Sequence, residues 1–503
     1  MRDLPTVVLD TTLAELYAKD GPNRIAQVLC GTNSGIELNP NFARNIKFLY
    51  QDTAFNETPK EELTESNKDL QGSLATKYLS LVPQRDAFVS GNTPVIFFNL
   101  DQSEDQIAHD KAEAEATIKN LDPSQKPKLL FFPGPAKIEL KPHNIDLLAY
   151  KVALDDLEAY PVTVPLETHW FLNSKVALCQ SGLPTPRCEL LELEDISPDA
   201  KSCCSVCSSS KDPLFIQNDC TGSRLKWLKS KISRITSAIA SRPTPFVVKN
   251  QQTFGGGGTY VVSDEKDREN LIKDLSSGLL SKLLSQVTSK NAHLNPGTIL
   301  ISDLVADPIG DYGVTFFVTK KGECIFLSAA EQMTDPNKAW IGSNISYNKQ
   351  GNLKEKFSPI MNDIGSWLHS HGYYGPAGAD ILETKPATQN GDHASSPNKN
   401  FHIVDLNVRT SGSLCLPLLR THFSVNRGLH EASSFSITVK MGREEFIEKW
   451  AKEFDEGRMC IVSWYYDRKI GASMADLAIG AEDEETLKKD IERVREGTEE
   501  VHF

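Results

Sequence analysis

Two short apolar runs on either side of a polar stretch constrain the fold most strongly. The runs, residues 93–100 and 128–132, are continuous rather than alternating, which fits strands buried on both faces. Between them, residues 104–121 are polar and rich in Ala and Glu, which favours a helix. A strand, a helix and a second strand imply a right-handed parallel crossover. The sequence therefore predicts an α/β unit, and no glycine-rich dinucleotide fingerprint opens its helix.

The composition is that of an ordinary globular protein. The chain has 503 residues, with 54 Lys and Arg against 67 Asp and Glu, so its formal net charge is −13. Hydrophobic residues make up 39% and charged residues 24%, which excludes a wholly disordered or collagen-like chain. An acidic chain also argues against nucleic acid as the main partner, because phosphate binding needs a basic face.

No targeting signal is evident in the sequence. The start lacks the basic and apolar regions of a signal peptide, and no apolar run approaches the roughly 20 residues of a membrane helix. We therefore expect a cytoplasmic protein with no membrane partner. In that compartment its ten cysteines would be reduced thiols.

A local group of cysteines has two interpretations. Cys204 and Cys207 form a Cys-x-x-Cys pair, with Cys203 and Cys220 nearby, and such a set is compatible with zinc. No second Cys-x-x-Cys follows, and the surrounding segment is polar and rich in serine. This favours a surface loop over a metal site, so we expect residues 201–221 to be exposed and mobile.

Pattern changes along the chain predict four regions. The first is an α/β domain, and the second carries a Ser/Cys-rich insertion at about 197–223. The third contains several strands and a polar, unperiodic loop at 384–400, and the fourth is an α/β tail packed on the core. Their predicted boundaries are 1–165, 166–297, 298–440 and 441–503.

Four consecutive glycines lie between two predicted strands of the second region. Glycine has no Cβ, so its N–H groups can approach phosphate oxygens closely. Lys249 ends the preceding strand and would place an ammonium group beside a phosphate. No Gly-Lys-Ser/Thr follows, which excludes a P-loop. A bland flexible turn is an equal alternative for the glycines alone, which are Gly255, Gly256, Gly257 and Gly258.

The strongest chemical signal is the strand Val404–Arg409. Alternate side chains share a face of a strand, so Asp405, Asn407 and Arg409 would line one face. Val404, Leu406 and Val408 would fill the other. Carboxylate and amide oxygens are hard ligands suited to Mg²⁺, and a guanidinium suits a phosphoryl oxygen. Asp380 on the preceding predicted strand would reach the same metal.

In this order the motifs resemble the ATP-grasp superfamily over residues 165–425. The resemblance implies an N-terminal pre-ATP-grasp domain, then an ATP-grasp fold with two subdomains and the nucleotide between two β-sheets. It also implies phosphate contacts from Lys175, Lys249 and the glycines, and adenine contacts from the backbone of Asp303 and Val305. Asp311 would hold the ribose. Asp380, Asp405 and Asn407 would be magnesium ligands, with Arg409 on the transferring phosphoryl group.

The function implied by the resemblance is a carboxylate–amine ligase that forms ADP. The cofactors would be ATP and Mg²⁺, or alternatively Mn²⁺, and the partners a small carboxylate and an amine such as an amino acid or its derivative. The chain most resembles fungal members tied to secondary metabolism. A carboxylate–thiol ligase, a non-catalytic nucleotide-binding scaffold and a homodimeric state all remain open. Glu331 and Gln332 would either line the substrate pocket or lie in a surface turn.

Overall fold

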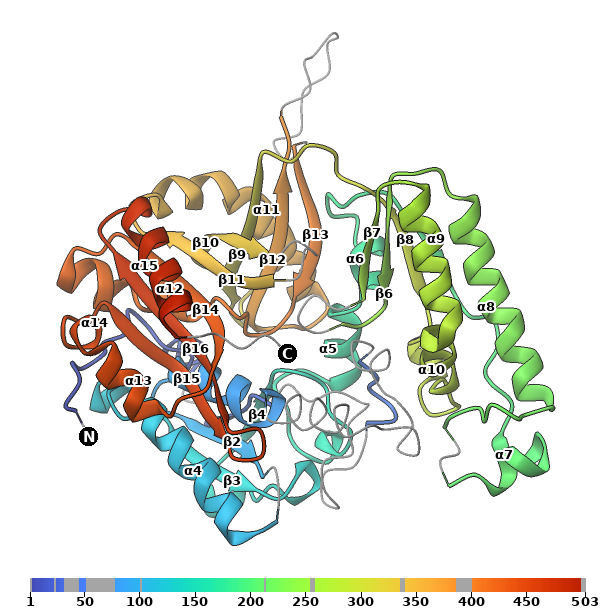
Figure 1. The fold of residues 1–503 in the computed structure, drawn as a ribbon, viewed down its shortest axis with the longest axis horizontal. Coiled ribbons are helices and arrows are strands. Elements are labelled where there is room, and N and C mark those ends of the chain that lie inside the picture. Colours follow the sequence, from blue (N-terminus) through green and yellow to red (C-terminus); the bar gives the residue numbers. More distant parts are fainter. Residues whose placement is uncertain are drawn as a thin grey trace.

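Three β-sheets organise the chain (Figure 1). The computed structural model describes residues 2–21, 24–30, 45–50, 77–99, 102–211, 214–253, 258–334, 340–385 and 400–498. Gly255, Gly256, Gly257 and most of the predicted polar loop 384–400 therefore lie outside the described residues. None of the helices within these ranges is long and apolar enough to cross a membrane.

The first sheet is the predicted parallel α/β unit. Its strand order is β3-β2-β1-β4, and every neighbouring pair is parallel. Helix α4 begins after Ser103, whose side chain accepts a hydrogen bond from the Gln106 N–H, as an N-cap should. The elements are β1 (Ile25–Val28), β2 (Pro94–Phe98), α4 (Glu104–Ile118), β3 (Lys128–Phe132) and β4 (Leu147–Tyr150).

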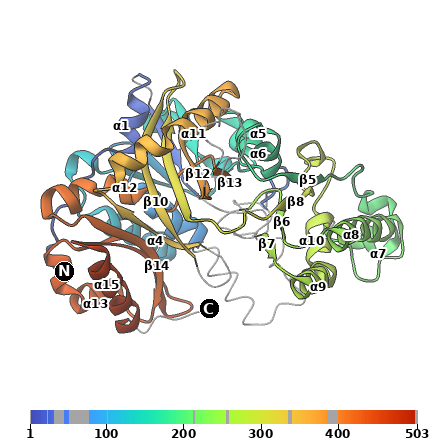
Figure 2. The same ribbon diagram turned by 90° about the horizontal axis from the view of Figure 1, so that it is seen from above.

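The second sheet is antiparallel and carries its helices on one side. Figure 2 shows α8, α9 and α10 on the side that faces away from the rest of the molecule. Strand β8 pairs with both β5 and β6, so this sheet extends to Asp303, past the predicted boundary at residue 297. The elements are β5 (Cys188–Leu191), α8 (Ser223–Ser241), β6 (Phe246–Asn250), β7 (Thr259–Val262), α9 (Glu265–Asp274), α10 (Leu280–Ser285) and β8 (Ile299–Asp303).

The third sheet is antiparallel, with the strand order β13-β12-β9-β10-β11-β14-β16-β15. Helix α11 packs its apolar face on β9 and β10, and α15 packs on β14 and β16. The elements are β9 (Gly310–Val318), β10 (Cys324–Thr334), β11 (Trp340–Ser346), α11 (Gln350–Ser370), β12 (Gly375–Glu383), β13 (Phe401–Asn407), β14 (Glu431–Val439), β15 (Met459–Asp467), β16 (Ala472–Ala481) and α15 (Glu484–Gly497).

The predicted tail 441–503 belongs to this third sheet. Strand β16 hydrogen-bonds β14 along its whole length, so the predicted boundary at residue 440 crosses a continuous sheet. Short helices complete the described chain. They are α1 (Leu13–Ala18), α3 (Val82–Phe88), α5 (Leu166–Leu172), α6 (Lys175–Gln180), α7 (Ser205–Ser209), α12 (Cys415–Leu418), α13 (Arg443–Lys449) and α14 (Ala451–Asp455).

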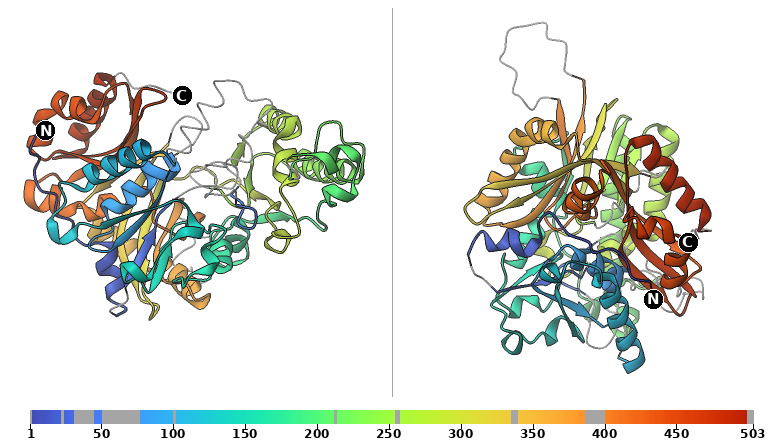
Figure 3. Two further views of the ribbon diagram at one scale, coloured as in Figure 1. Left: turned by 90° about the horizontal axis from the view of Figure 1, so that it is seen from below. Right: turned by 90° about the vertical axis from the view of Figure 1, so that its left-hand side faces the viewer.

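The N-terminal domain packs directly on the last strands of the chain, as Figure 3 shows from two further sides. The Tyr465 hydroxyl in β15 donates to the Asp110 carboxylate in α4 over 2.7 Å. The backbone N–H of Trp464 donates to the Gln84 side-chain oxygen over 3.2 Å. The first and third sheets therefore belong to domains that share an interface, and the mixture of parallel and antiparallel sheets with helices agrees with the predicted α/β class.

The cysteines differ from the prediction in two ways. Cys179 and Cys188 are joined by a disulfide, which corrects the expectation that all ten thiols are reduced. The chain between them turns back from α6 into β5, and this brings the two Cα atoms to 6.4 Å. The insertion also differs, since Cys207 and Cys220 are each only 1% exposed. An exposed loop over 201–221 was therefore wrong for these positions.

Candidate active site

Two carboxylates face each other across neighbouring strands at the edge of the third sheet. Asp380 in β12 lies opposite Asp405 in β13. The pairing register shifts next to this pair, so that Ile381 lies opposite Ile403 and Val404 has no partner. Like charges directly opposite one another destabilise a sheet. A positive charge near the two carboxylates would reduce this repulsion.

The same register shift corrects the predicted alternation of side chains in β13. Val404 does not join the core, and Ile403 packs there with Leu406 and Val408. A β-bulge inserts one unpaired residue and turns the strand locally. The bulge leaves the carbonyl of Val404 available to a side chain from the second sheet, the Lys249 ammonium group, which donates to it over 2.6 Å.

Two lysines from the second region contact this strand, and Figure 1 shows the elements that carry them, α6 and β6, beside β13. Lys249 comes from β6 of the second sheet. Lys175 is the first residue of α6, whose N-cap Ser174 accepts from the Ala177 N–H. The Lys175 ammonium forms an ion pair with the Asp405 carboxylate. The two predicted phosphate lysines and the predicted metal ligands therefore lie together, although they are far apart in sequence.

Asn407 and Arg409 belong to one hydrogen-bonded chain. Arg409 donates to the Asn407 side-chain oxygen over 2.9 Å and to the Asn173 side-chain oxygen over 2.7 Å. The Asn407 amide donates to Asp380 over 3.3 Å. The guanidinium is thus held in place from two sides, with the amide group linking it to a carboxylate.

Gln332 was named in the sequence without a defined role, and the structure places it in the site. It lies in β10 rather than in a turn, and its amide donates to the second Asp380 oxygen, Oδ1, over 3.0 Å. The Ser343 hydroxyl donates to the Gln332 side-chain oxygen over 3.3 Å, and the Trp340 indole N–H donates to the Ser343 hydroxyl over 3.1 Å. Sequence reasoning missed Ser343 and Trp340, because no motif marks them. The alternation that turns Gln332 inward was the only signal for its role.

Burial and charge shift the pKa values of these groups in opposite directions. Burial raises the pKa of the Asp380 carboxyl to about 7, and the charges of Asp405 and Asp311 raise it as well. Burial also acts to raise the pKa of Asp405, but the ammonium groups of Lys175 and Lys249 hold it below its usual value. Burial lowers the pKa of Lys249 to about 8, although Asp405 opposes this.

The donor set fits a hard divalent cation. Asp380 and Asp405 supply two carboxylates, which suit Mg²⁺ or Mn²⁺. The Asn407 oxygen accepts from Arg409, so it would join them by turning the amide towards the metal. Burial and the neighbouring carboxylates raise the pKa of Asp380, and a bound cation would oppose this effect. These three residues would hold the metal.

The predicted adenine and ribose residues lie at the end of β8 in the second sheet, in the segment that follows it, and in β9 of the third sheet. Asp303 ends β8, its N–H donates to the Arg187 carbonyl over 2.9 Å, and its carboxylate pairs with Arg242 over 2.6 Å. Val305 follows it and is half-buried, and Asp311 lies at the exposed start of β9. Their nucleotide contacts stay predictions.

Gly258 is the one member of the glycine run that the structure describes. It has a φ of +73°, which favours glycine. A Cβ at this position would overlap the side chain of Asn250. Gly258 closes the β6–β7 hairpin through its carbonyl, which accepts from the Asn250 N–H over 2.9 Å. A backbone constraint therefore explains this glycine.

A buried ion pair lies behind Arg409 and was not seen in the sequence. Lys151 and Asp86 are 2% and 1% exposed, and the Lys151 ammonium donates to the Asp86 carboxylate. It also donates to the Thr410 hydroxyl over 2.9 Å and to the Thr410 carbonyl over 3.0 Å. Both charged residues come from the N-terminal domain, which thereby fixes the segment next to Arg409.

No family model matches the chain, and no curated protein sequence matches it. Among solved structures it is similar to N5-carboxyaminoimidazole ribonucleotide synthetase in its ADP complex, with 12% identity over 95% of this chain and 98% of that chain and a TM-score of 0.48. It is also similar to carboxyaminoimidazole ribonucleotide synthase from Aspergillus clavatus with ATP, with 10% identity over 95% of this chain and 98% of that chain and a TM-score of 0.45. A third similar structure is phosphoribosylamine–glycine ligase from Thermotoga maritima, with 13% identity over 73% of this chain and 90% of that chain and a TM-score of 0.41. At these identities and scores the likeness carries no assignment, and the proposal below rests on this chain's own side chains.

Proposed function

We propose that this chain is an ATP-grasp ligase. It activates the carboxylate of a small molecule as an acylphosphate and joins it to an amine, releasing ADP and phosphate. An amino acid or a derivative is the proposed class of substrate, with secondary metabolism as its setting. The observation that carries the proposal is the meeting of Lys175 and Lys249 with Asp380 and Asp405.

The two lysines are suited to bind the phosphates of ATP. The Lys249 ammonium donates to a backbone carbonyl, that of Val404, and burial lowers its pKa, because the charge is poorly solvated. Phosphate oxygens would provide stronger partners for a buried ammonium than a neutral carbonyl does. Adenine would lie against the strand end at Asp303 and Val305, with the ribose hydroxyls near Asp311.

Charge neutralisation would supply most of the catalysis. A carboxylate oxygen of the substrate attacks the γ-phosphorus of ATP, and the bond to the β-phosphate oxygen breaks to leave ADP. Arg409, positioned by Asn173 and Asn407, would stabilise the transferring phosphoryl group. A magnesium ion held by Asp380, Asp405 and Asn407 would neutralise charge on the β- and γ-phosphates.

The amine then attacks the acylphosphate carbonyl carbon. Phosphate leaves with one of the original carboxylate oxygens, and the amine loses its proton to solvent. The chain needs no covalent nucleophile for this sequence, because positioning and charge do the work. Exclusion of water from the site would protect the acylphosphate from hydrolysis.

The test is a reaction of the purified protein with ATP, Mg²⁺, and mixed carboxylates and amines. We expect ADP and a product whose mass equals carboxylate plus amine minus water. With ¹⁸O-labelled carboxylate, we expect label in the released phosphate. The Asn407→Ala protein, prepared in parallel, reports any contaminating ATPase.

Each other outcome contradicts a specific part of the proposal. AMP as the main nucleotide product would end the acylphosphate route. A thioester that forms only when thiols are supplied would indicate the carboxylate–thiol ligase. Nucleotide binding without turnover of any substrate in the pool would favour the non-catalytic scaffold.

A further inference from the structure

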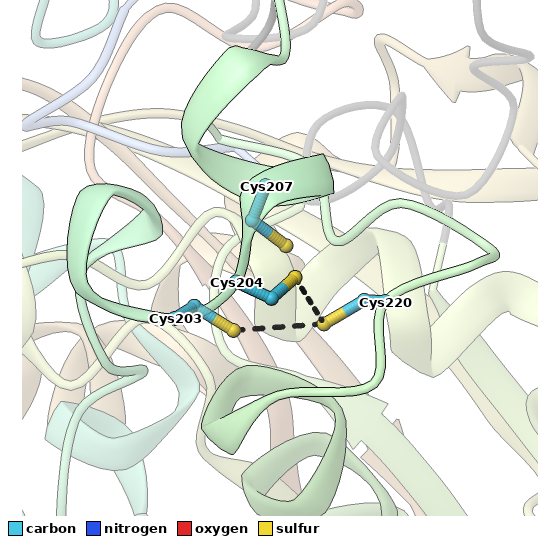
Figure 4. A group of neighbouring side chains, drawn as sticks. All are labelled: Cys203, Cys204, Cys207 and Cys220. Carbon is cyan, nitrogen blue, oxygen red and sulfur yellow. Dashed lines mark hydrogen bonds between the residues drawn. The ribbon is translucent and has the colours of Figure 1, made fainter.

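Four cysteine side chains converge in the insertion at the outer end of the second sheet (Figure 4). They belong to Cys203, Cys204, Cys207 and Cys220, and their sulfur atoms all lie within 4.8 Å of one another. Cys207 and Cys220 are buried, and the other two are partly exposed. Figure 1 shows this region around α7, far from β13 and the candidate active site.

The separations between the sulfur atoms fit a tetrahedral metal site. The Sγ of Cys220 lies 3.6 Å from that of Cys203 and 3.8 Å from that of Cys204. A zinc ion with Zn–S bonds of about 2.3 Å has sulfurs about 3.8 Å apart at the tetrahedron edges. A disulfide needs about 2.05 Å, and Cys179 with Cys188 forms one in the same molecule. The four sulfurs are therefore grouped but not bonded.

A backbone N–H group points at one of these sulfurs. The Arg224 N–H donates to the Cys203 sulfur over 3.3 Å. Such bonds stabilise thiolates and orient metal ligands. The Arg224 N–H also belongs to the first turn of α8, whose positive end favours the negative charge of a zinc tetrathiolate.

The surrounding chain is built around these sulfurs. A Cβ at Gly222 would lie 2.5 Å from the Cys203 sulfur, so a larger residue there would displace that ligand. The Arg224 side chain, 3% exposed, donates to the carbonyls of Leu214 and Phe215 over 3.2 and 3.4 Å. This holds the segment before Cys220 in place.

The insertion has too little apolar area to fold as a separate core. Besides the cysteines, its cluster contains one fully buried apolar residue, Ala200, with Ile216 and Leu225 partly buried. Small units without an adequate core usually rely on a disulfide or a metal. Cysteine ligands with no open position are typical of a structural zinc site rather than a catalytic one.

We propose that Cys203, Cys204, Cys207 and Cys220 bind one structural Zn²⁺ ion that fixes the insertion on the N-terminus of α8. This site is independent of the ligase activity, and it reverses the interpretation favoured by the sequence alone. The adjacent pair Cys203–Cys204 and the distant Cys220 hid the pattern, because zinc motifs are recognised by two separated pairs.

The direct test is metal analysis of the full-length protein, expressed with zinc in the medium and purified without chelator. We expect about one zinc per chain in the wild-type protein. The Cys207→Ser and Cys220→Ser proteins should retain at least tenfold less. The matched control is Cys324→Ser, because Cys324 is a free cysteine outside the cluster, and it should keep its zinc.

Cobalt substitution tests the ligand set on the wild-type protein, even if the serine variants do not fold. We expect the visible absorption of tetrahedral Co²⁺ and an intense thiolate-to-metal band, both abolished by zinc. Four thiols should become reactive on removal of zinc by a chelator. A wild-type protein without zinc, with iron in its place, or with an intact mass that reveals a disulfide among the four cysteines would overturn the proposal.

Discussion

At the scale of single residues, the candidate site is dominated by the neighbouring carboxylates of Asp380 and Asp405, whose negative charges repel each other. Asp380 accepts hydrogen bonds from Gln332 and Asn407, whereas Asp405 has the ion pair with Lys175. The two carboxylates therefore differ in their environment although they lie side by side.

Replacement of Asn407 by Ala separates function from stability. It removes an amide that positions Arg409 and a proposed metal ligand, and we expect ADP formation to fall by about 10²–10³-fold. Asn407 is only half-buried, so the unfolding midpoint should change little. His402→Ala on the same strand is the control and should keep its activity. Full activity of the Asn407→Ala protein at ordinary magnesium would refute the assignment.

The raised pKa of Asp380 predicts the direction of a pH effect. In the metal-free protein the folded state holds a proton up to about pH 7, whereas the unfolded chain loses it near pH 4. The folded state binds more protons in this window, so stability falls as pH rises from about 4 to 7, by up to about 1.4 kcal/mol per pH unit. The slope disappears above about pH 7.

Urea unfolding between pH 4.5 and 8 checks this prediction. The Asp380→Asn protein should show a flatter pH profile than the wild type, because the titrating group is gone. Mg²⁺ should flatten the wild-type profile and leave that of the variant unchanged. Parallel profiles for the two metal-free proteins would show that Asp380 does not titrate in this range.

At the scale of elements, the β6–β7 hairpin and β13 are the parts that bring the two sheets together. Lys249 lies one residue before the end of β6 and donates to the Val404 carbonyl. Val404 is the unpaired residue of the bulge in β13. Gly258 closes the hairpin.

The Gly258→Ala substitution should loosen the β6–β7 hairpin. An alanine at a φ of +73° costs about 1–2 kcal/mol, and its Cβ would also overlap Asn250 and Thr253. Gly471 in the β15–β16 turn has a φ of +62° with open space around it, so Gly471→Ala carries only the strain. Hydrogen exchange should show faster exchange in β6 and β7 for Gly258→Ala, together with weaker ATP binding. Equal effects on local exchange in the two variants would exclude the steric contribution.

The sequence predicted the elements with strong local signals. The apolar runs of β2 and β3, the helix α4 between them and the strand β13 were all located, because each depends on its own residues. Strand β16 was missed, since Ala472–Ala481 is buried throughout and rich in Ala, with no alternation of apolar and polar residues and with Ile479 as its one β-branched residue. Its pairing with β14 and β15 determines the structure, and a local pattern does not reveal such a partner.

The candidate site was also predictable where the signal is local and not where it depends on distant contacts. Asp380, Asp405 and Asn407 were predicted from the strands that carry them, and the structure brings these residues together. The bulge at Val404, the support from Trp340 and the cysteine cluster depend on contacts between distant segments. Nothing in the local pattern specifies them.

At the scale of the whole molecule, the N-terminal domain contributes directly to the geometry of the site. Lys151 and Asp86 from that domain hold Thr410, the residue after Arg409. Arg409 is thus positioned by its own sheet, by Asn173 and by a domain that precedes it by more than two hundred residues. The N-terminal domain is therefore part of the framework that positions the candidate site.

The buried pair should behave as one energetic unit. Lys151→Met or Asp86→Asn alone leaves one polar or charged partner uncompensated, and we expect a loss of about 3–5 kcal/mol in each. The double variant should lose less than the sum, and a double-mutant cycle by denaturant unfolding measures the difference. The exposed pair Arg24 and Asp146 in the same domain is the control, with an expected coupling below about 1 kcal/mol. Additive losses at Lys151 and Asp86 would contradict this coupling.

The packing of α4 on β15 has a consequence for biosynthesis. The face of the N-terminal domain that carries Asp110 and Gln84 is covered by Tyr465 and Trp464, residues that leave the ribosome long after the first sheet. At about 5–20 residues per second, β15 follows β2 by roughly 20–70 s. During this interval the nascent chain presents an unfinished docking surface. A chaperone that shields it, or a slower step in translation, would act on the yield of native protein through this single interface.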